Sequence, residues 1–383
     1  MAKVMLEKTH AGYFYEGSGA LFTEDEITER SNTERRKNAD ALDAVRDAGF
    51  VCYPLFVKTI DGRSVEKEAW VHPSFEPSCS AGFFEKHGMR YNVYIPSYER
   101  AGTAGTMKML DGFDVTNYYI CIDPAQFAKY STVYPLERLV VRDISFRDPD
   151  MLDATSGMKL PITMAGHAPL CNFTLALSRS MGESHFWFMD DDILNLAVKT
   201  RRNDCTFTST EPYEKSKYHR VSRLTEDLGF DFKDFMQRIE EVMLSIRNPG
   251  FVGLEKFGAV WTTPVMWRTG TRVYSYYLTN NETQVTHYGR QNNDVITSLE
   301  LTKNGLVNLL HQGVRYNSEP TQIGTGGQAI LYQTLGTADK GRVLCRAQPA
   351  HTKIAYRYHR IHHEGTFRHG TSQRVVGQVL ESC

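Results

Sequence analysis

The sequence predicts an α/β fold in which a mixed, mainly parallel central sheet is flanked by helices. Short apolar segments alternate with helical patterns between residues 91 and 195, which is typical of a parallel sheet covered on both faces. The chain has 383 residues, of which 41% are hydrophobic, so it can bury the core of one large catalytic domain with additions. No apolar run is long enough to cross a membrane and the first residues lack the core of a signal peptide, so we expect a soluble, cytoplasmic protein.

Residues 1–90 are predicted to form an N-terminal appendage that precedes the main domain. They contain a helical pattern over residues 33–48, which ends at Gly49 because glycine is a common C-terminal stop. The alternating apolar residues 51–57 then predict a strand that Pro54 interrupts.

The main domain is predicted to span residues 91–335, and its first half covers residues 91–195. The predicted strands of this half are 92–96, 118–122, 139–141 and 185–189, and its main helices are 103–110 and 170–181. Gly182 follows the second helix, where a C-terminal stop is expected. Ligands of such sheets bind at the carboxyl ends of the strands, so we expect functional residues in the loops that follow them.

The second half of the domain, residues 196–335, has a different pattern with longer polar stretches. Its predicted elements are a helix at 232–246, strands at 257–261 and 272–278, and a helix at 294–303. Residues 336–383 are predicted to form a basic C-terminal segment that is rich in Arg, His and Tyr.

The net charge and the cysteine distribution argue against several classes of protein. The formal net charge is -1, whereas a dedicated DNA-binding protein usually carries a clear basic excess, so a polyanion would have to bind at a local patch. The seven cysteines are scattered and include no CxxC pair. This distribution argues against a zinc site or a disulfide framework and favours reduced thiols.

The strongest chemical signal is an acidic triplet, Asp190-Asp191-Asp192, directly after the apolar segment 185–189. Adjacent carboxylates repel each other and resist desolvation, and a divalent cation such as Mn²⁺ or Mg²⁺ would remove that penalty. Alternate side chains of an extended segment point the same way, so Asp190 and Asp192 are the predicted metal ligands. The structural alternative is an acidic turn that caps a following helix.

Three further motifs decide between a nucleotidyltransferase, a phosphatase and a glycosyltransferase. They are Ile95-Pro96-Ser97-Tyr98-Glu99-Arg100-Ala101-Gly102, Cys171-Asn172-Phe173-Thr174-Leu175-Ala176-Leu177-Ser178-Arg179-Ser180-Met181-Gly182 and Asn292-Asn293-Asp294-Val295. Together with the acidic triplet, they make residues 91–330 resemble the GT-A class of glycosyltransferases, which have a Rossmann-like fold. The resemblance implies a nucleotide-sugar half at 91–195 and an acceptor half at 196–335.

The resemblance also implies roles for individual residues in binding the sugar nucleotide. The donor-binding residues would be Pro96, Ser97, Tyr98, Arg100, Asn172, Arg179, Asp190 and Asp191. Arg100 would add a charge-assisted contact to the diphosphate, in a turn whose backbone amides lie near a helix N-terminus. The alternative for Arg100 and for Arg179 is a solvated surface residue.

The acceptor motif places Asp294 where the class has a catalytic base, with Asp192 as the second catalytic residue at the metal. This chain has Asn293 where a glutamate is common, and Asp294 could instead cap a helix. Glu300 is the alternative base. The glycines of 324–328 would allow close approach of the backbone to a ligand, although a simple turn explains them equally well.

Among GT-A enzymes, the combination of these motifs most resembles the TET/JBP-associated glycosyltransferases, found in bacteriophages and related to the base J glucosyltransferase. This resemblance implies transfer to 5-hydroxymethylcytosine or 5-hydroxymethyluracil in DNA, in the host cytoplasm if the protein is phage-encoded. UDP-glucose is the donor implied by default, and UDP-arabinose is the alternative. Rival hypotheses are a GT-A enzyme with a protein, lipid or polysaccharide acceptor, and a non-enzymatic DNA-binding module.

Basic clusters give independent support to a DNA acceptor. From residue 341 to residue 374 the chain has seven Lys and Arg residues against one acid, Glu364, and tyrosines lie among them. A second basic run follows the acidic triplet. The predicted DNA contacts are Arg201, Arg202, Lys353, Arg357, Arg360 and Arg368. Each cluster taken alone is explained as well by a solvated face.

Overall fold

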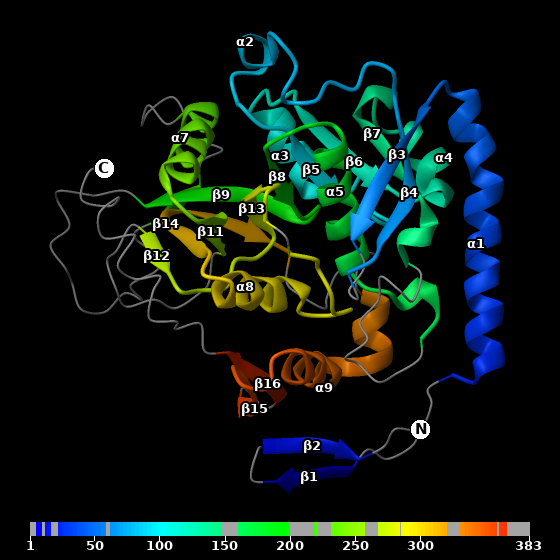
Figure 1. The fold of residues 1–383 in the computed structure, drawn as a ribbon, viewed down its shortest axis with the longest axis vertical. Coiled ribbons are helices and arrows are strands. Elements are labelled where there is room, and N and C mark those ends of the chain that lie inside the picture. Colours follow the sequence, from blue (N-terminus) through cyan, green and yellow to red (C-terminus); the bar gives the residue numbers. More distant parts are fainter. Residues whose placement is uncertain are drawn as a thin grey trace, which may run out of the picture.

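The computed structural model describes residues 5–9, 12–16, 22–58, 62–147, 160–199, 218–220, 231–256, 267–283, 285–319, 329–357 and 360–365. Its centre is a large mixed sheet with the strand order β10-β9-β14-β11-β13-β8-β5-β6-β7-β4-β3, and β12 pairs with β14 beside this path. Helices flank the sheet, as Figure 1 shows. The predicted α/β fold with a mixed sheet is therefore confirmed, although most described strand pairs of this sheet are antiparallel, whereas the sequence predicted a mainly parallel sheet.

The predicted parallel part of the sheet is formed by four neighbouring strands. They are β5 (Val93–Pro96), β6 (Tyr118–Ile122), β7 (Leu139–Arg142) and β8 (His185–Met189). The pairs β5–β6, β5–β8 and β6–β7 are all parallel, so the carboxyl ends of these strands meet at one edge. The main helices between them are α3 (Gly105–Gly112) and α5 (Ala168–Ser180).

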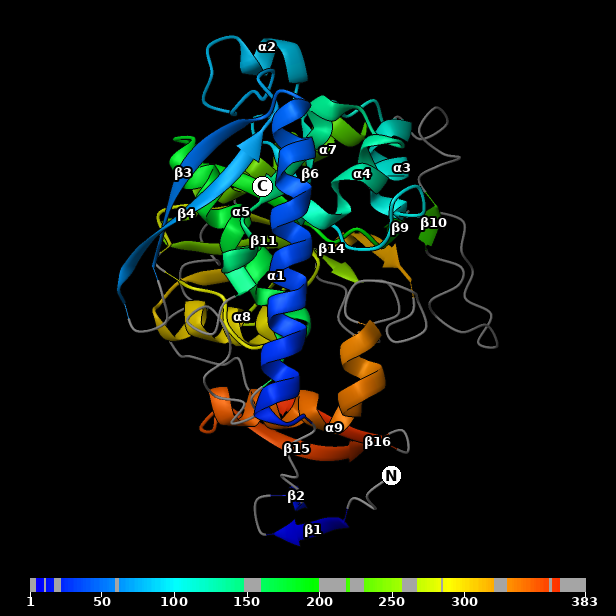
Figure 2. The ribbon, with the colours of Figure 1, turned by 90° about the vertical axis from the view of Figure 1, so that its right-hand side faces the viewer.

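Two strands from the chain before residue 91 continue the same sheet. Strand β4 (Ser64–Val71) pairs with β7, and β3 (Val51–Lys58) pairs with β4 at the edge of the sheet, the position at which a strand proline such as Pro54 is tolerated. Helix α1 (Glu24–Asp47) runs along the outside of this half in Figures 1 and 2. It begins well before residue 33 because Thr23 and Glu26 form a capping box.

The second half of the chain adds mostly antiparallel strands. They are β9 (Ile193–Lys199), β10 (Tyr218–Arg220), β11 (Pro249–Lys256), β12 (Trp267–Thr269), β13 (Tyr276–Asn280) and β14 (Val307–Ser318). Among these strands only β11 and β14 pair in parallel in the described part of the chain. Helices α7 (Phe232–Ser245) and α8 (Asn293–Lys303) match the predicted helices closely. The predicted strand at 257–261 lies outside the described residues.

The C-terminal segment packs as a separate layer next to α8. Helix α9 (Ala329–Ala347) is followed by the hairpin of β15 (Thr352–Arg357) and β16 (Arg360–Gly365), which packs against that helix. A second hairpin, β1 (Met5–Thr9) with β2 (Gly12–Glu16), lies beside β15. Figure 1 shows both hairpins at the bottom of the view. No described helix combines the length and apolarity that a membrane span requires.

The core lies on both faces of the sheet. One cluster includes Trp187, Met189 and Tyr276 and is covered by α3 and α7, and the other includes Tyr94, Phe173 and Phe188 and is covered by α5. Because β8 contributes to both clusters, its backbone is fixed from both sides. The loop that follows β8 therefore starts from a rigid strand end.

Candidate active site

The acidic triplet lies at the carboxyl end of β8, between that strand and β9. The alternative that these acids cap a helix is wrong, because the strand β9 follows. Thr106, in the first turn of α3, fixes the backbone of the triplet: its hydroxyl donates to the Asp190 carbonyl and accepts from the Ile193 amide at 3.0 Å. Gly105 permits this approach, since a Cβ there would lie 2.7 Å from the Ile193 carbonyl oxygen.

Asp191 is held by the loop that follows β5. Ser97 donates a hydrogen bond to one of its oxygens and Arg100 donates from Nη1 to the other, each at 2.6 Å. The Tyr130 hydroxyl lies 2.7 Å from the Ser97 hydroxyl and accepts from the Arg100 amide at 3.1 Å. Burial raises the pKa of Asp191, while Arg100 and Ser97 act to lower it. The Asp191 side chain thus locks the β5 loop to the acidic triplet.

Asp190 faces α5 and not the β5 loop. His167, immediately before that helix, places its Nε2 atom 3.3 Å from an Asp190 carboxylate oxygen. Burial acts to raise the pKa of Asp190, but the charge of His167, its hydrogen bond and the hydrogen bond from Ser275 together lower that pKa. The backbone amide of Asp190 donates to the Ser275 carbonyl at 2.8 Å, so the residue directly before β13 also holds Asp190.

Asp192 has the least compensated carboxylate of the three. Its Oδ1 atom is buried and has no hydrogen-bond partner among the described residues. Burial, followed by the neighbouring charges of Asp190 and Asp191, raises the pKa of Asp192 to about 7. A divalent cation would relieve this crowding, and two carboxylates suit Mg²⁺ or Mn²⁺. In the described part of the chain, however, no three His, Cys, Asp or Glu side chains are arranged as a ready set of ligands.

Asp294 reaches the same region from the first turn of α8. Burial raises the pKa of Asp294, the nearby Lys340 acts to lower it, and the charge of Asp190 adds to the rise. One carboxylate oxygen accepts from the Val295 amide at 2.7 Å. Asn293 donates to the Cys171 sulfur on α5 at 3.3 Å, which ties the start of α8 to the helix that follows His167. The fold therefore brings Asp294 within electrostatic reach of the acidic triplet.

The other predicted donor-binding residues of α5 have structural partners. The Asn172 amide is buried and exchanges two hydrogen bonds with the His287 backbone, at 2.7 and 2.8 Å. Arg179 donates to the carbonyls of Asn281 and Thr283. It lies twelve residues beyond His167, about 18 Å along the helix, so it is not gathered with the acids. Roles for both residues in donor binding stay predictions.

Pro96 and Tyr98 flank Ser97 at the end of β5. Pro96 is the last residue of the strand, and the Tyr98 ring lies under the Arg147 guanidinium, 5.2 Å from it. Arg147 and Arg142 both pair with the buried Asp123, which follows β6. A charged cluster therefore borders the β5 loop at Tyr98.

The predicted DNA contacts are described only in part. Arg201, Arg202 and Arg368 lie outside the described residues, as do the glycines of 324–328. Arg357 and Arg360 occupy paired positions at the end of the β15–β16 hairpin. Lys353 is exposed and pairs with Glu364 at 3.1 Å.

The mixed sheet flanked by helices, with an acidic triplet at a strand end, is consistent with a glycosyltransferase-like α/β fold. The family model named TET-Associated Glycosyltransferase matches residues 91–327, more than half of the chain, and the chain belongs to this family. The resemblance stated from the motifs is thereby confirmed. Comparison with curated proteins and with solved structures gives no significant match.

Sequence reasoning did not identify His167 or Thr106 as parts of this site. His167 contacts Asp190, and Thr106 holds the backbone on either side of the triplet. A histidine directly before the helix that leads into an acid-terminated strand was the available signal for the first residue. A lone threonine in a first helical turn carries no comparable signal.

Proposed function

We propose that the protein is a metal-dependent glycosyltransferase that moves a sugar from a nucleotide sugar, a UDP-sugar, to 5-hydroxymethylcytosine or 5-hydroxymethyluracil in DNA. One observation carries the proposal. The triplet Asp190–Asp192 follows a strand at the carboxyl edge of the sheet, where ligands of α/β folds bind, and the distant Asp294 lies within electrostatic reach of Asp190. Membership of the glycosyltransferase family supports the reaction class.

Asp190 and Asp192 are the residues that would hold Mn²⁺ or Mg²⁺. The unpartnered Asp192 oxygen and the crowded negative charge are the features that fit a cation. When bound, the cation would neutralise the diphosphate of the leaving nucleotide. Arg100, fixed by its hydrogen bond to Asp191, holds a second positive charge beside the same position.

Asp294 is the better candidate for the base that takes the proton from the acceptor hydroxyl. Burial raises the pKa of Asp294, and a higher pKa makes a carboxylate a stronger base. Glu300, the alternative, accepts hydrogen bonds from Tyr288, Lys303 and Gln348 and its pKa is lowered, so it is less available as a base. A base at Asp294 belongs to a reaction that inverts the anomeric centre.

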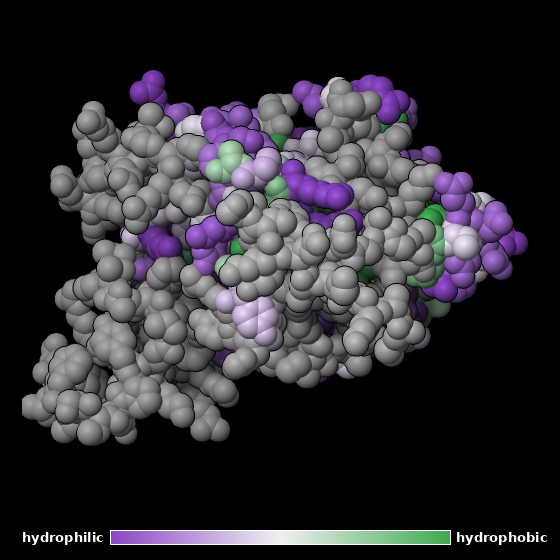
Figure 3. All heavy atoms as spheres, turned by 90° about the horizontal axis from the view of Figure 1, so that it is seen from below, coloured by the Kyte–Doolittle hydropathy of each residue, from purple (hydrophilic) through white to green (hydrophobic). Residues whose placement is uncertain are grey.

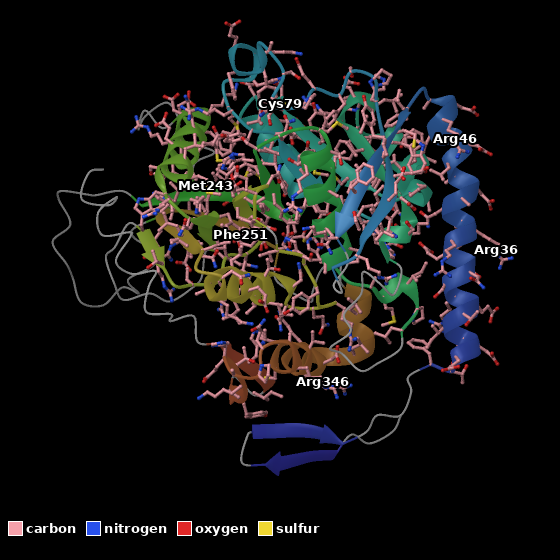
Figure 4. All side chains as sticks on the ribbon, in the orientation of Figure 1. Arg36, Arg46, Cys79, Met243, Phe251 and Arg346 are labelled. Atoms are coloured by element: carbon pink, nitrogen blue, oxygen red, sulfur yellow. The ribbon has the colours of Figure 1, made fainter. Side chains whose placement is uncertain are left out.

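The C-terminal segment supports a DNA acceptor. Arg346 and Tyr356 are exposed on α9 and β15, and Figure 4 shows where Arg346 lies on the layer next to α8. A basic surface with a tyrosine can hold phosphates and stack on a base. Because a base inside a duplex is inaccessible, the acceptor would be flipped out or unpaired.

The test is nucleotide release from UDP-glucose and UDP-arabinose, with and without DNA that contains 5-hydroxymethylpyrimidines. We expect release that requires both Mn²⁺ and hydroxymethylated DNA, and none with unmodified DNA of the same sequence. Release that depends on a protein, lipid or polysaccharide acceptor would favour the rival enzyme. DNA binding without release of any nucleotide would favour a non-enzymatic binding module.

A further inference from the structure

Helix α1 buries a polar face where most surface helices bury an apolar one. Its buried residues are Ser31, Glu34, Asn38 and Val45, and the first three recur one turn apart. Most of its remaining surface is exposed, and the end of the molecule formed by α1, on the right in Figure 3, is largely hydrophilic. Such a helix gains little from apolar burial, so its buried polar groups need specific partners.

Two of these residues hold loops at the functional edge of the sheet. The Asn38 side-chain oxygen accepts from the Ala125 amide at 3.0 Å, two residues after Asp123. The Ser31 hydroxyl accepts from the Ile162 amide at 3.2 Å, in the segment that leads to His167. Helix α1 is therefore attached to the carboxyl edge of the sheet, where the acidic triplet also lies.

Glu34 lies between these two residues and has no comparable partner. It is only 8% exposed, and in the described part of the chain its carboxylate accepts one hydrogen bond, from the Asn38 amide at 3.3 Å, and pairs with no cation. A carboxylate can accept about four hydrogen bonds, and a buried charge without compensation is costly. The Glu34 carboxylate can therefore accept further hydrogen bonds, although it lies at a largely buried position.

Glu34 lies within electrostatic reach of the loop after β5. Burial raises the pKa of Tyr98, Arg147 acts to lower it, and the charge of Glu34 adds to the rise, so the carboxylate and the phenol lie within electrostatic reach. Tyr98 directly follows Ser97, which binds Asp191. The chain therefore passes directly from Tyr98, beside Glu34 and Arg147, to the residue that contacts the acidic triplet.

We propose that Glu34 binds the nucleoside of the nucleotide-sugar donor by accepting a hydrogen bond from a ribose hydroxyl, which makes α1 one wall of the donor site. The inference rests on the proposed function. A carboxylate repels phosphate and attracts hydroxyl donors, so the ribose fits this position and the diphosphate fits Arg100. Helix α1 precedes residues 91–327, which match the family model. Residues 91–327 alone would therefore lack part of the donor site.

The experiment is calorimetric titration of the full-length protein with UDP in the presence of Mn²⁺, comparing Glu34→Gln with wild type. The matched control is Arg36→Gln, because Arg36 is exposed on the same helix and projects away from the sheet in Figure 4. We expect Glu34→Gln to bind UDP roughly tenfold more weakly, as for loss of a hydrogen bond to a charged group. Arg36→Gln should bind as wild type does, and both should keep the wild-type melting temperature within about 2 °C.

Titration with 2′-deoxy-UDP and 3′-deoxy-UDP identifies the contact. For the wild type, one of these analogues should bind about tenfold more weakly than UDP, and for Glu34→Gln that difference should disappear. Unchanged UDP affinity of Glu34→Gln, or the same weakening for UDP and both analogues, overturns the inference and leaves the proposed function intact. If the wild type binds none of UDP, CDP, ADP, GDP and dTDP, the donor site itself fails and the inference fails with it.

Discussion

Replacing Asp192 by asparagine should stabilise the protein and abolish transfer at the same time. The side chain keeps its shape, but the least compensated charge of the triplet is removed. The pKa of this carboxyl rises from 3.8 to about 7 on folding, mainly through burial and then through Asp190 and Asp191. Each tenfold change in proton affinity corresponds to about 1.4 kcal/mol, so full ionisation costs the folded state at most about 4 kcal/mol.

The pH dependence gives the sign of this effect. A carboxyl with a raised folded pKa contributes stability that is complete below about pH 4 and is lost as the pH rises to about 7. Because three acids share the repulsion, we expect Asp192→Asn to gain about 2 kcal/mol on wild type between pH 5 and pH 8. In EDTA the urea midpoint of the variant at pH 8 should therefore lie several tenths of a molar above that of wild type.

Adding Mn²⁺ distinguishes binding of a cation by the triplet from simple repulsion among its three carboxylates. The wild-type midpoint at pH 8 should rise with Mn²⁺ because the cation binds the folded state, and the midpoint of Asp192→Asn should respond far less. Sugar transfer should be lost in the variant. An advantage that is equal at pH 5 and pH 8, or equal stabilisation of both proteins by Mn²⁺, would refute the reasoning.

Three further changes test other contacts of the site. Asp294→Asn should reduce transfer about a hundredfold without weakening UDP binding, because the base that takes the acceptor proton is lost. The control Glu300→Gln should keep transfer within about threefold of wild type, and equal loss of transfer in both variants would exclude Asp294 as the base. Gly166→Ala should lower the unfolding free energy by about 2 kcal/mol or more. The φ of Gly166 is 78°, and a Cβ at this position would lie 2.0 Å from the Arg290 carbonyl oxygen. An unchanged melting curve would contradict this close packing. Asp339→Ala should cost about 3 kcal/mol because it leaves Arg290 buried without its bidentate partner, and an unchanged urea midpoint would show that the pair is not buried in solution.

The strands of the parallel half were predictable because their signals are local. Strands β6 and β8 match the predicted ranges 118–122 and 185–189, since every residue in them is buried and each run has clear ends. Strand β14 was missed because its interior contains polar residues. Asn308 donates to the Ser298 carbonyl and Gln312 to the Glu255 carboxylate, so these amides are buried with partners that only the tertiary fold supplies.

In the candidate site, too, the local features were predictable from the sequence and the tertiary contacts were not. Three consecutive aspartates after an apolar strand are visible in the sequence alone, and the structure places them at a strand end as expected. The contact between His167 and Asp190 joins the start of α5 to the end of β8, and Ser31 and Asn38 reach the edge of the sheet from far upstream. No short-range pattern contains such contacts, because they form only when the helices close over the sheet.

The packing of the C-terminal segment bears on how an acceptor could be presented to the base. Arg290 makes a buried bidentate pair with Asp339 on α9, and Asn292 donates to the Lys340 carbonyl on the same helix. Both residues lie in the few positions directly before Asp294, so α9 is fixed to the chain that positions the candidate base. A surface on α9 and its hairpin that holds DNA would therefore keep a constant distance from Asp294. This coupling gives a physical reason for a basic segment outside the family-matching residues to influence transfer without contacting the sugar nucleotide.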